Sequence, residues 1–214
     1  MKRIGNIFEK IIDIDNLRRA YKRSRRGKTK LRLVKEVDKD SEKYLAEIQK
    51  SLIDKTYKTS KYKIFKLIER GKEREICNLP YYPDRIVHWA LMYQIEPIFR
   101  RLLIYDTYAA LPEKGTHKAL RRLHKFMQDK EETKYCLKLD VRKYYNSVDK
   151  EILKQMLRKH IKCKNTLWLL DEIIDSYPNG IPIGNYTSQY FGNFYLSEFD
   201  HWLKEEKHIK YYFK

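Results

Sequence analysis

Residues 135–148 combine an extended pattern with a single acid and an aromatic pair. Apolar side chains alternate over 135–139, the spacing that places them on one face of a β-strand. These are Tyr135, Leu137 and Leu139. Asp140 follows at the expected end of the strand, and Tyr144 and Tyr145 come four and five residues later. The segment therefore predicts a strand that carries one carboxylate to a sheet edge and then turns into a helix.

The chain is strongly basic, and the charge is concentrated toward its N-terminus. Its formal net charge at pH 7 is +18, and residues 18–35 contain ten basic residues and no acidic one. Such a run is usually a solvated basic arm, suited to salt-sensitive neutralisation of phosphates. The charge therefore makes nucleic acid the first candidate partner. The alternative interpretation is that the chain is a basic protein that binds membrane surfaces. The candidate nucleic-acid contacts in this run are Arg18, Arg19, Arg23, Arg25 and Arg26.

Other features of the sequence narrow the class of protein further. No apolar run is long enough to span a bilayer and no signal-peptide pattern is present, which favours a cytoplasmic protein with no membrane partner. The three cysteines lie far apart without a His/Cys cluster, which predicts free thiols rather than a zinc site. Cys77 and Cys136 lie in apolar stretches and are expected in the core.

Periodicity predicts an α+β chain made mostly of helices. Asp84, Thr116, and Ser147 or Asp149 are expected as helix N-caps. Strands are expected over 61–68 and 73–79, which form a hairpin around the turn 69–72, and also at 135–140 and at the C-terminal end. Helices are expected in part of 1–35 and over about 40–54, 84–103, 116–127, 149–157, 165–176 and 187–206. The last of these is expected to bury Phe191, Phe194, Leu196, Phe199 and Leu203.

Three of these segments carry residue types suited to phosphate chemistry. Arg74 in the hairpin can fork around a triphosphate and Lys72 can add a point charge, with solvated turn cations as the alternative. Glycine and proline in loop 180–189 allow close approach of backbone to a ligand. Asp140 and the carbonyl of Val141 are the hard oxygen ligands that Mg²⁺ takes, although a lone acid at a strand end is more often structural.

Taken in order, these motifs resemble those of bacterial reverse transcriptases. Residues 139–148 look like the family's first catalytic motif, an apolar residue and Asp followed by an aromatic pair. The stretches 71–99 and 105–117 resemble its fingers motifs and the loop that follows them. Where most members have Gln-Gly and Ser-Pro, this chain has Ile183-Gly184 and Ser188-Gln189. That variant is similar to the reverse transcriptases of diversity-generating retroelements.

The resemblance implies the fingers and a partial palm of a right-hand polymerase, with the thumb absent. A basic N-terminal arm at 1–35, fingers at 36–110 and an incomplete palm at 111–214 are the expected divisions. The resemblance runs from about Asn6 to the last residue and stops just before the family's aromatic-x-Asp-Asp motif. This stretch is therefore expected to be inactive on its own.

The same resemblance assigns roles to residues. Asp140 is implied as the catalytic ligand of two Mg²⁺ ions, and Tyr145 as the aromatic that excludes ribonucleotides. Lys72 and Arg74 are implied as contacts to the deoxynucleoside triphosphate. Ile183, Gly184 and Gln189 are implied as a wall of the nucleotide pocket, where Ile183 in place of Gln suggests looser base selection. Lys114 and His117 are candidates to touch nucleic-acid backbone, and a purely structural loop is the alternative.

The implied partners are an RNA template, a DNA primer or cDNA, deoxynucleotides and a small basic accessory protein. Three alternatives stay open. In the first, the chain is a reverse transcriptase of another bacterial lineage, such as a group II intron, retron or abortive-infection type. In the second, it is a non-catalytic RNA-binding module, since a basic arm and exposed aromatics suffice for RNA binding. In the third, it is a basic structural protein with no nucleic-acid role.

Overall fold

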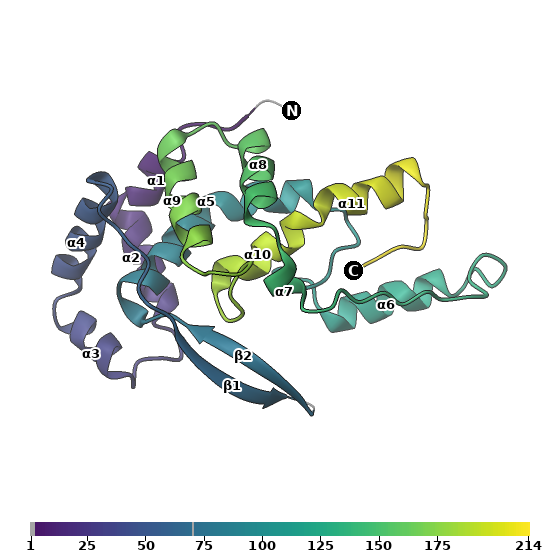
Figure 1. Ribbon diagram of the computed structural model, residues 1–214, viewed down its shortest axis with the longest axis horizontal. Coiled ribbons are helices and arrows are strands. Elements are labelled where there is room, and N and C mark those ends of the chain that lie inside the picture. Colours follow the sequence, from purple (N-terminus) through teal and green to yellow (C-terminus); the bar gives the residue numbers. More distant parts are fainter. Residues whose placement is uncertain (1–2, 70) are drawn as a thin grey trace.

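The computed structural model describes residues 3–69 and 71–214, apart from the side chains of Glu69 and Lys72. Helices make up most of this chain, and an antiparallel hairpin of two strands projects from one side of them (Figure 1). This agrees with the expected α+β class. The long helices and the strands are α2 (Ile14–Ser24), α3 (Arg32–Lys39), α4 (Ser41–Ile53), β1 (Lys63–Glu69), β2 (Lys72–Asn78), α5 (Ile86–Leu102), α6 (Thr116–Phe126), α8 (Lys150–His160), α9 (Lys164–Asp175) and α10 (Tyr186–Tyr195). The short elements are α1 (Phe8–Ile12), η1 (Tyr81–Arg85), α7 (Tyr144–Ser147), α11 (Ser197–His201) and η2 (Trp202–Glu206).

Helix α5 is the centre of the core. It contacts α1, α2 and α10, and the apolar residues of its inner face are fully or almost fully buried. The predicted inward positions Val87, Leu91, Ile95 and Ile98 are all among them. One hydrophobic cluster runs from Ile7 to Phe194 and so crosses both of the expected divisions of the chain.

The N-terminal helices are part of this core. Asp13 caps α2 by accepting hydrogen bonds from the amides of Asp15 and Asn16. The Asn16 side chain then donates to the carbonyl of Ala90 on α5 at 3.1 Å and accepts from Gln94 at 2.8 Å. The apolar face of α2 is thereby fixed against α5.

The hairpin formed as the sequence predicts. Lys63 pairs with Asn78 and Glu69 with Lys72, so β1 and β2 are in register along their whole length. Gly71 has a φ of +75°, which suits a tight turn. The apolar residues Ile64, Phe65, Leu67 and Ile68 are exposed because this two-stranded sheet extends away from the helices.

Two expected helix caps are wrong. The Asp84 carboxylate is fully buried and accepts from the Tyr57 hydroxyl at 2.8 Å and the Ser60 amide at 3.1 Å. It therefore ties the loop before β1 to η1 instead of capping α5, which begins at Ile86. Thr116 is the first residue of α6 and follows Gly115, which makes no side-chain cap bond. Asp149, in contrast, caps α8 through the amide of Ile152 as expected.

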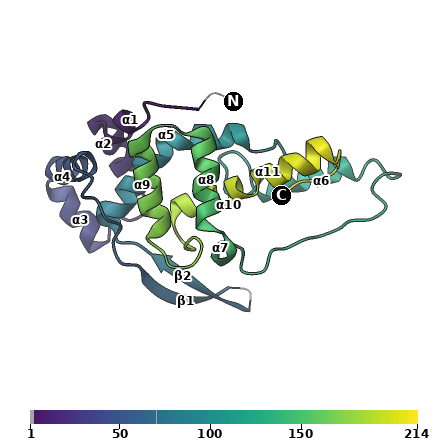
Figure 2. The same cartoon turned by 45° about the horizontal axis from the view of Figure 1, so that its top comes forward.

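The strand expected at 135–140 does not form. Within the described residues, 134–142 make no backbone hydrogen bond to another backbone group. Figure 2 shows this segment running outside the helices on its way to α7. Tyr135 is 95% exposed and Leu139 is 72% exposed, and Cys136 is exposed rather than buried, whereas Cys77 is buried as expected. An alternating pattern becomes a strand only where another strand satisfies its backbone groups.

The end of the chain also differs from expectation. The helix expected over 187–206 is interrupted at Leu196, so that Phe199 is exposed and stacks on Trp202 instead of entering the core. The final residues form no regular strand. Lys214 nevertheless exchanges backbone hydrogen bonds with Asp106 and Tyr108 at 3.0 and 2.7 Å. The buried Asp200 holds this segment by accepting from the Tyr212 hydroxyl at 2.6 Å and pairing with Lys214.

Candidate nucleotide and nucleic-acid site

Three segments that are far apart in the sequence meet at the loop 177–185. The amide of Ile181 donates to the carbonyl of Tyr145 at 2.9 Å. Two residues further on, the carbonyl of Ile183 accepts from the amide of Cys77 on β2 at 2.7 Å. The loop therefore bridges the aromatic pair after Asp140 and the base of the hairpin. All three segments were selected from the sequence as parts of one nucleotide site.

Two glycines make this close approach possible. Gly180 has a φ of +65°, and a Cβ atom there would lie 2.2 Å from the Tyr145 carbonyl oxygen. Gly184 has a φ of +116°, and its Cβ would lie 2.6 Å from the Cys77 carbonyl oxygen. Real Cβ atoms do not come so close to backbone oxygen, so a side chain at either position would force the segments apart.

The aromatic pair lies on the face of α10. The Tyr144 hydroxyl donates to the carbonyl of Gly192 at 2.6 Å. The Tyr145 ring lies edge to face with the Tyr144 ring, with the two ring centres 5.7 Å apart, and packs against the main hydrophobic cluster. Burial raises the pKa of the Tyr145 hydroxyl, which therefore stays protonated at neutral pH.

Asp140 and Val141 are exposed residues of the unpaired segment 134–142. Magnesium takes six oxygen ligands in near-octahedral geometry, usually one or two carboxylates with water and phosphate. No group of three or more His, Cys, Asp or Glu side chains comes together in the described part of the chain. The residues present therefore do not fit a two-magnesium site by themselves.

The predicted triphosphate contacts belong to β2. Arg74 pairs with Leu67 across the hairpin, and its side chain is exposed. Lys72 begins the strand, and its side chain lies outside the described residues. The hairpin thus presents Arg74 beyond the helices, while its base is joined to the Ile183 loop.

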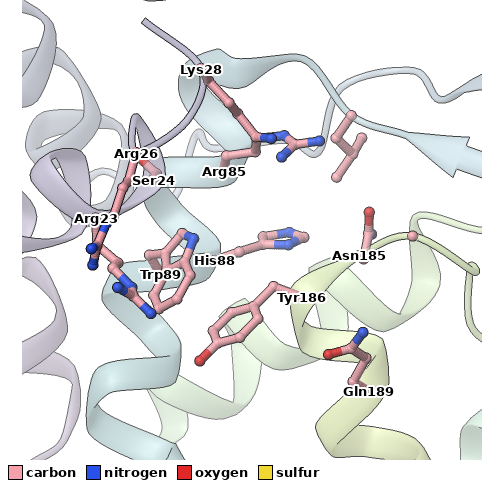
Figure 3. A pocket seen from close by; sticks show the side chains of 12 residues that line it. Arg23, Ser24, Arg26, Lys28, Arg85, His88, Trp89, Asn185, Tyr186 and Gln189 are labelled. Carbon is pink, nitrogen blue, oxygen red and sulfur yellow. The ribbon is translucent and has the colours of Figure 1, made fainter. Parts of the chain in front are cut away.

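A pocket of about 540 Å³ lies on the other side of that loop, between the end of α2, the first turns of α5 and the start of α10. Figure 3 shows cationic and aromatic side chains converging on it from these elements. Gly184 and Gln189 contribute to its wall, whereas Ile183 does not line it. The lining residues are Arg23, Ser24, Arg26, Lys28, Leu79, Arg85, His88, Trp89, Gly184, Asn185, Tyr186 and Gln189.

The arginines of the basic run divide into two groups. Arg23 and Arg26 line the pocket. Arg18 forms ion pairs with Asp15 of α2 and with Glu42 of α4. The other two also have structural partners, since Arg25 pairs with Asp38 at 2.5 Å and Arg19 lies 4.1 Å from the centre of the Tyr93 ring. The run is therefore not uniformly a solvated arm.

Lys114 and His117 lie away from the pocket, at the start of α6. Lys114 donates to the carbonyl of Tyr105 at 2.5 Å and lies over the rings of Tyr105 and Tyr108. Burial lowers its pKa. His117 is exposed. Lys114 thus has a structural role in the 105–117 loop.

The pocket also contains Trp89, to which the sequence gave no binding role. Trp89 and Tyr186 stack with ring centres 4.0 Å apart and planes 19° apart. Asn185 is buried and donates from its amide to the Tyr62 hydroxyl at 3.0 Å. The sequence signal that points to this part of the pocket is the spacing of Arg85, His88 and Trp89, which places the three side chains on one side of a helix.

Comparison with known proteins gives a distant relationship. No family model matches the chain. Protein YkfC of Escherichia coli (strain K12) is 28% identical over 147 residues, which is 63% of this chain and 38% of that protein. The chain thus spans little more than a third of its relative's length. No helix in the described residues is long and apolar enough to cross a membrane.

Proposed function

We propose that the chain is the fingers and part of the palm of an RNA-directed DNA polymerase of the diversity-generating retroelement type. One observation carries the proposal. The loop 177–185 is joined by backbone hydrogen bonds to Tyr145 on one side and to Cys77 on the other. A polymerase of this class needs these three segments around one incoming nucleotide, and sequence separation alone gives no reason for them to meet.

In this proposal Tyr145 lies beneath the sugar and discriminates against a 2′-hydroxyl by steric clash. Its partly buried ring and its contact with Tyr144 give it the rigidity that such discrimination requires. Arg74 contacts the triphosphate from the hairpin, and Lys72 is proposed to add a second cation there. Ile183 joins the loop to β2 through its backbone carbonyl and carries an aliphatic side chain where most of the family have Gln, which is our hypothesis for loose base selection.

Asp140 is proposed as one carboxylate of the catalytic centre. Because the described residues do not fit a pair of magnesium ions, further carboxylates are required before the chemistry can proceed. An RNA template, a cDNA strand, deoxynucleoside triphosphates and a small basic accessory protein are the proposed partners. A cytoplasmic location belongs to the same proposal.

The test is magnesium-dependent incorporation of deoxynucleotides on an RNA template. It compares this chain with the chain lengthened through the reading frame that follows Lys214, and uses Asp140→Asn in both. Incorporation by the longer protein that is lost in Asp140→Asn supports the polymerase. Absence of incorporation by a folded longer protein contradicts it.

The second candidate is a non-catalytic RNA-binding module. The basic pocket favours it, because four cationic side chains line that pocket and it needs no metal to bind RNA. This candidate predicts salt-sensitive RNA binding without incorporation in either length of the chain.

A further inference from the structure

The pocket between α2, α5 and α10 has an excess of positive charge that its surroundings do not neutralise. Arg23, Arg26, Lys28 and Arg85 line it, and no acidic side chain does so among the described residues. Within residues 3–69 and 71–214, none of these four cations pairs with a carboxylate. Summed over one concave surface, such charges attract an anion such as the phosphodiester backbone.

Charge alone does not distinguish a phosphate site from a nucleotide site, but the pocket also has a flat aromatic wall. Trp89 stacks on Tyr186, and the Arg23 guanidinium lies 5.2 Å from the centre of an indole ring. Aromatic rings and guanidinium planes are the surfaces on which unpaired bases stack. The volume of about 540 Å³ is also in the range of pockets that hold small organic ligands rather than a bare phosphate.

His88 adds a buried polar atom without a hydrogen-bond partner among the described residues. Its side chain is 3% exposed, it lines the pocket, and its Nε2 atom makes no hydrogen bond within the described residues. Figure 3 shows the imidazole between Arg85 and Tyr186, directed into the space that the pocket encloses. A buried polar atom without a partner is costly, so a ligand that offers one gains affinity at that point.

The ionisation of His88 indicates what that partner is. Burial, assisted by the positive charge of Arg85, lowers the His88 pKa to about 4. The imidazole is therefore neutral at pH 7 and offers one donor and one acceptor rather than a cation. It suits the edge of a base or a ribose hydroxyl, while the neighbouring arginines suit phosphates.

We propose that this pocket binds one unpaired nucleotide of a single-stranded RNA. Arg23, Arg26 and Lys28 neutralise its flanking phosphates, the Trp89–Tyr186 wall stacks its base, and His88 hydrogen-bonds to the nucleoside. The bases of a duplex are stacked on each other and cannot enter, so a double strand is excluded. The choice of RNA over DNA rests on the proposed function, whereas the nucleotide chemistry rests on the pocket itself.

The first experiment measures the affinity of the full chain for a fluorescent single-stranded RNA at several salt concentrations. Arg23→Ala and Arg26→Ala remove exposed, pocket-lining cations, and Arg18→Ala removes the same charge from outside the pocket, on the side of α2 that faces α4. We expect each pocket variant to bind about fivefold more weakly and to flatten the salt dependence by about 0.7 in log–log slope. Arg18→Ala should keep the wild-type slope. Equal losses in all three variants would overturn the proposal, because only bulk charge would then matter.

The second experiment locates the base. Binding of unlabelled RNA should quench tryptophan fluorescence in the wild type and in Trp202→Phe, but much less in Trp89→Phe. His88→Phe keeps the ring shape and removes both nitrogen atoms, and His88→Gln keeps a donor and an acceptor. We expect His88→Phe to abolish affinity differences among homopolymeric RNAs, and His88→Gln to keep part of them. Circular dichroism identifies any variant that does not fold, and the Arg23 and Arg26 variants decide the proposal in that case.

Competition separates the possible sources of the nucleotide. A single-stranded RNA should displace the probe at far lower concentration than AMP, ATP or an RNA duplex. Displacement by AMP or ATP at the same concentration as RNA would make the ligand a free nucleotide, and equal displacement by the duplex would exclude an unpaired base. None of these measurements needs magnesium or deoxynucleotides. A failure of polymerase activity therefore leaves them unchanged.

Discussion

Replacement of Gly180 by alanine tests whether the loop 177–185 is held against Tyr145 as described. The added methyl group meets two penalties. A φ of +65° costs an L-residue roughly 1–2 kcal/mol. A Cβ only 2.2 Å from the Tyr145 carbonyl oxygen forces backbone apart, at roughly 1–3 kcal/mol for the strain and about 1 kcal/mol for the weakened Ile181–Tyr145 hydrogen bond. Gly180→Ala should therefore destabilise the protein by roughly 3–6 kcal/mol.

Gly27→Ala is the matched control. Gly27 has a φ of +73°, but nothing lies within 4 Å of the position of its Cβ. Gly27→Ala should lower the free energy of unfolding only by the conformational cost, roughly 1–2 kcal/mol. Urea unfolding followed by circular dichroism gives both values. If Gly180→Ala and Gly27→Ala destabilise the protein equally, the close contact between Gly180 and Tyr145 is wrong, and with it the main support for a shared nucleotide site.

Two further predictions concern His88 and the segment 134–142. Because the His88 pKa of about 4 lies below its ordinary value of about 6.5, the unfolded chain binds a proton that the folded chain does not. Its contribution to the free energy of unfolding is present above about pH 6.5 and falls by roughly 2 kcal/mol between pH 7 and pH 5. Urea unfolding at both pH values should show this difference in the wild type and a smaller one in His88→Gln; equal differences would contradict it. Leu139→Asn should change the free energy of unfolding by less than about 0.5 kcal/mol because the side chain is 72% exposed, and a loss above about 2 kcal/mol would indicate a buried strand instead.

Local signals in the sequence predicted local structure well. The turn residues around Gly71 and the two alternating runs beside it predicted the hairpin, and the acid at Asp149 predicted the start of α8. In each case the residues that decide the structure lie within a few positions of one another. The central helix α5 was also predicted, because its apolar residues recur at helical spacing over several turns.

Two of the wrong predictions involve partners far away in the sequence. Asp84 is a residue type that commonly caps helices, but the Tyr57 hydroxyl and the Ser60 amide, from another part of the chain, donate hydrogen bonds to its carboxylate. Residues 135–140 have the pattern of a strand, but no described segment pairs with them. A local pattern indicates which secondary structure a segment can form, and the tertiary neighbours decide whether that structure forms.

The residues that meet in the pocket were selected from the sequence as separate groups, and their meeting was not predicted. Gly184 and Gln189 were selected from one loop, and Arg23 and Arg26 from a basic run much earlier in the chain. Their convergence on one pocket depends on the packing of α2 against α5, which Asn16 helps to fix. The role of Trp89 could not be predicted without that packing, because a tryptophan in a helix is more often a core residue.

The unpaired segment 134–142 has a consequence for the behaviour of the protein in concentrated solution. Its free backbone groups and its exposed row of Tyr135, Leu137 and Leu139 are the features through which separate molecules add to one another edge to edge and form fibrils. Lys138 and Arg142 add positive charges beside the row, and these repel a second copy. Salt screens that repulsion, so we expect association through this segment to increase with the ionic strength of the solution.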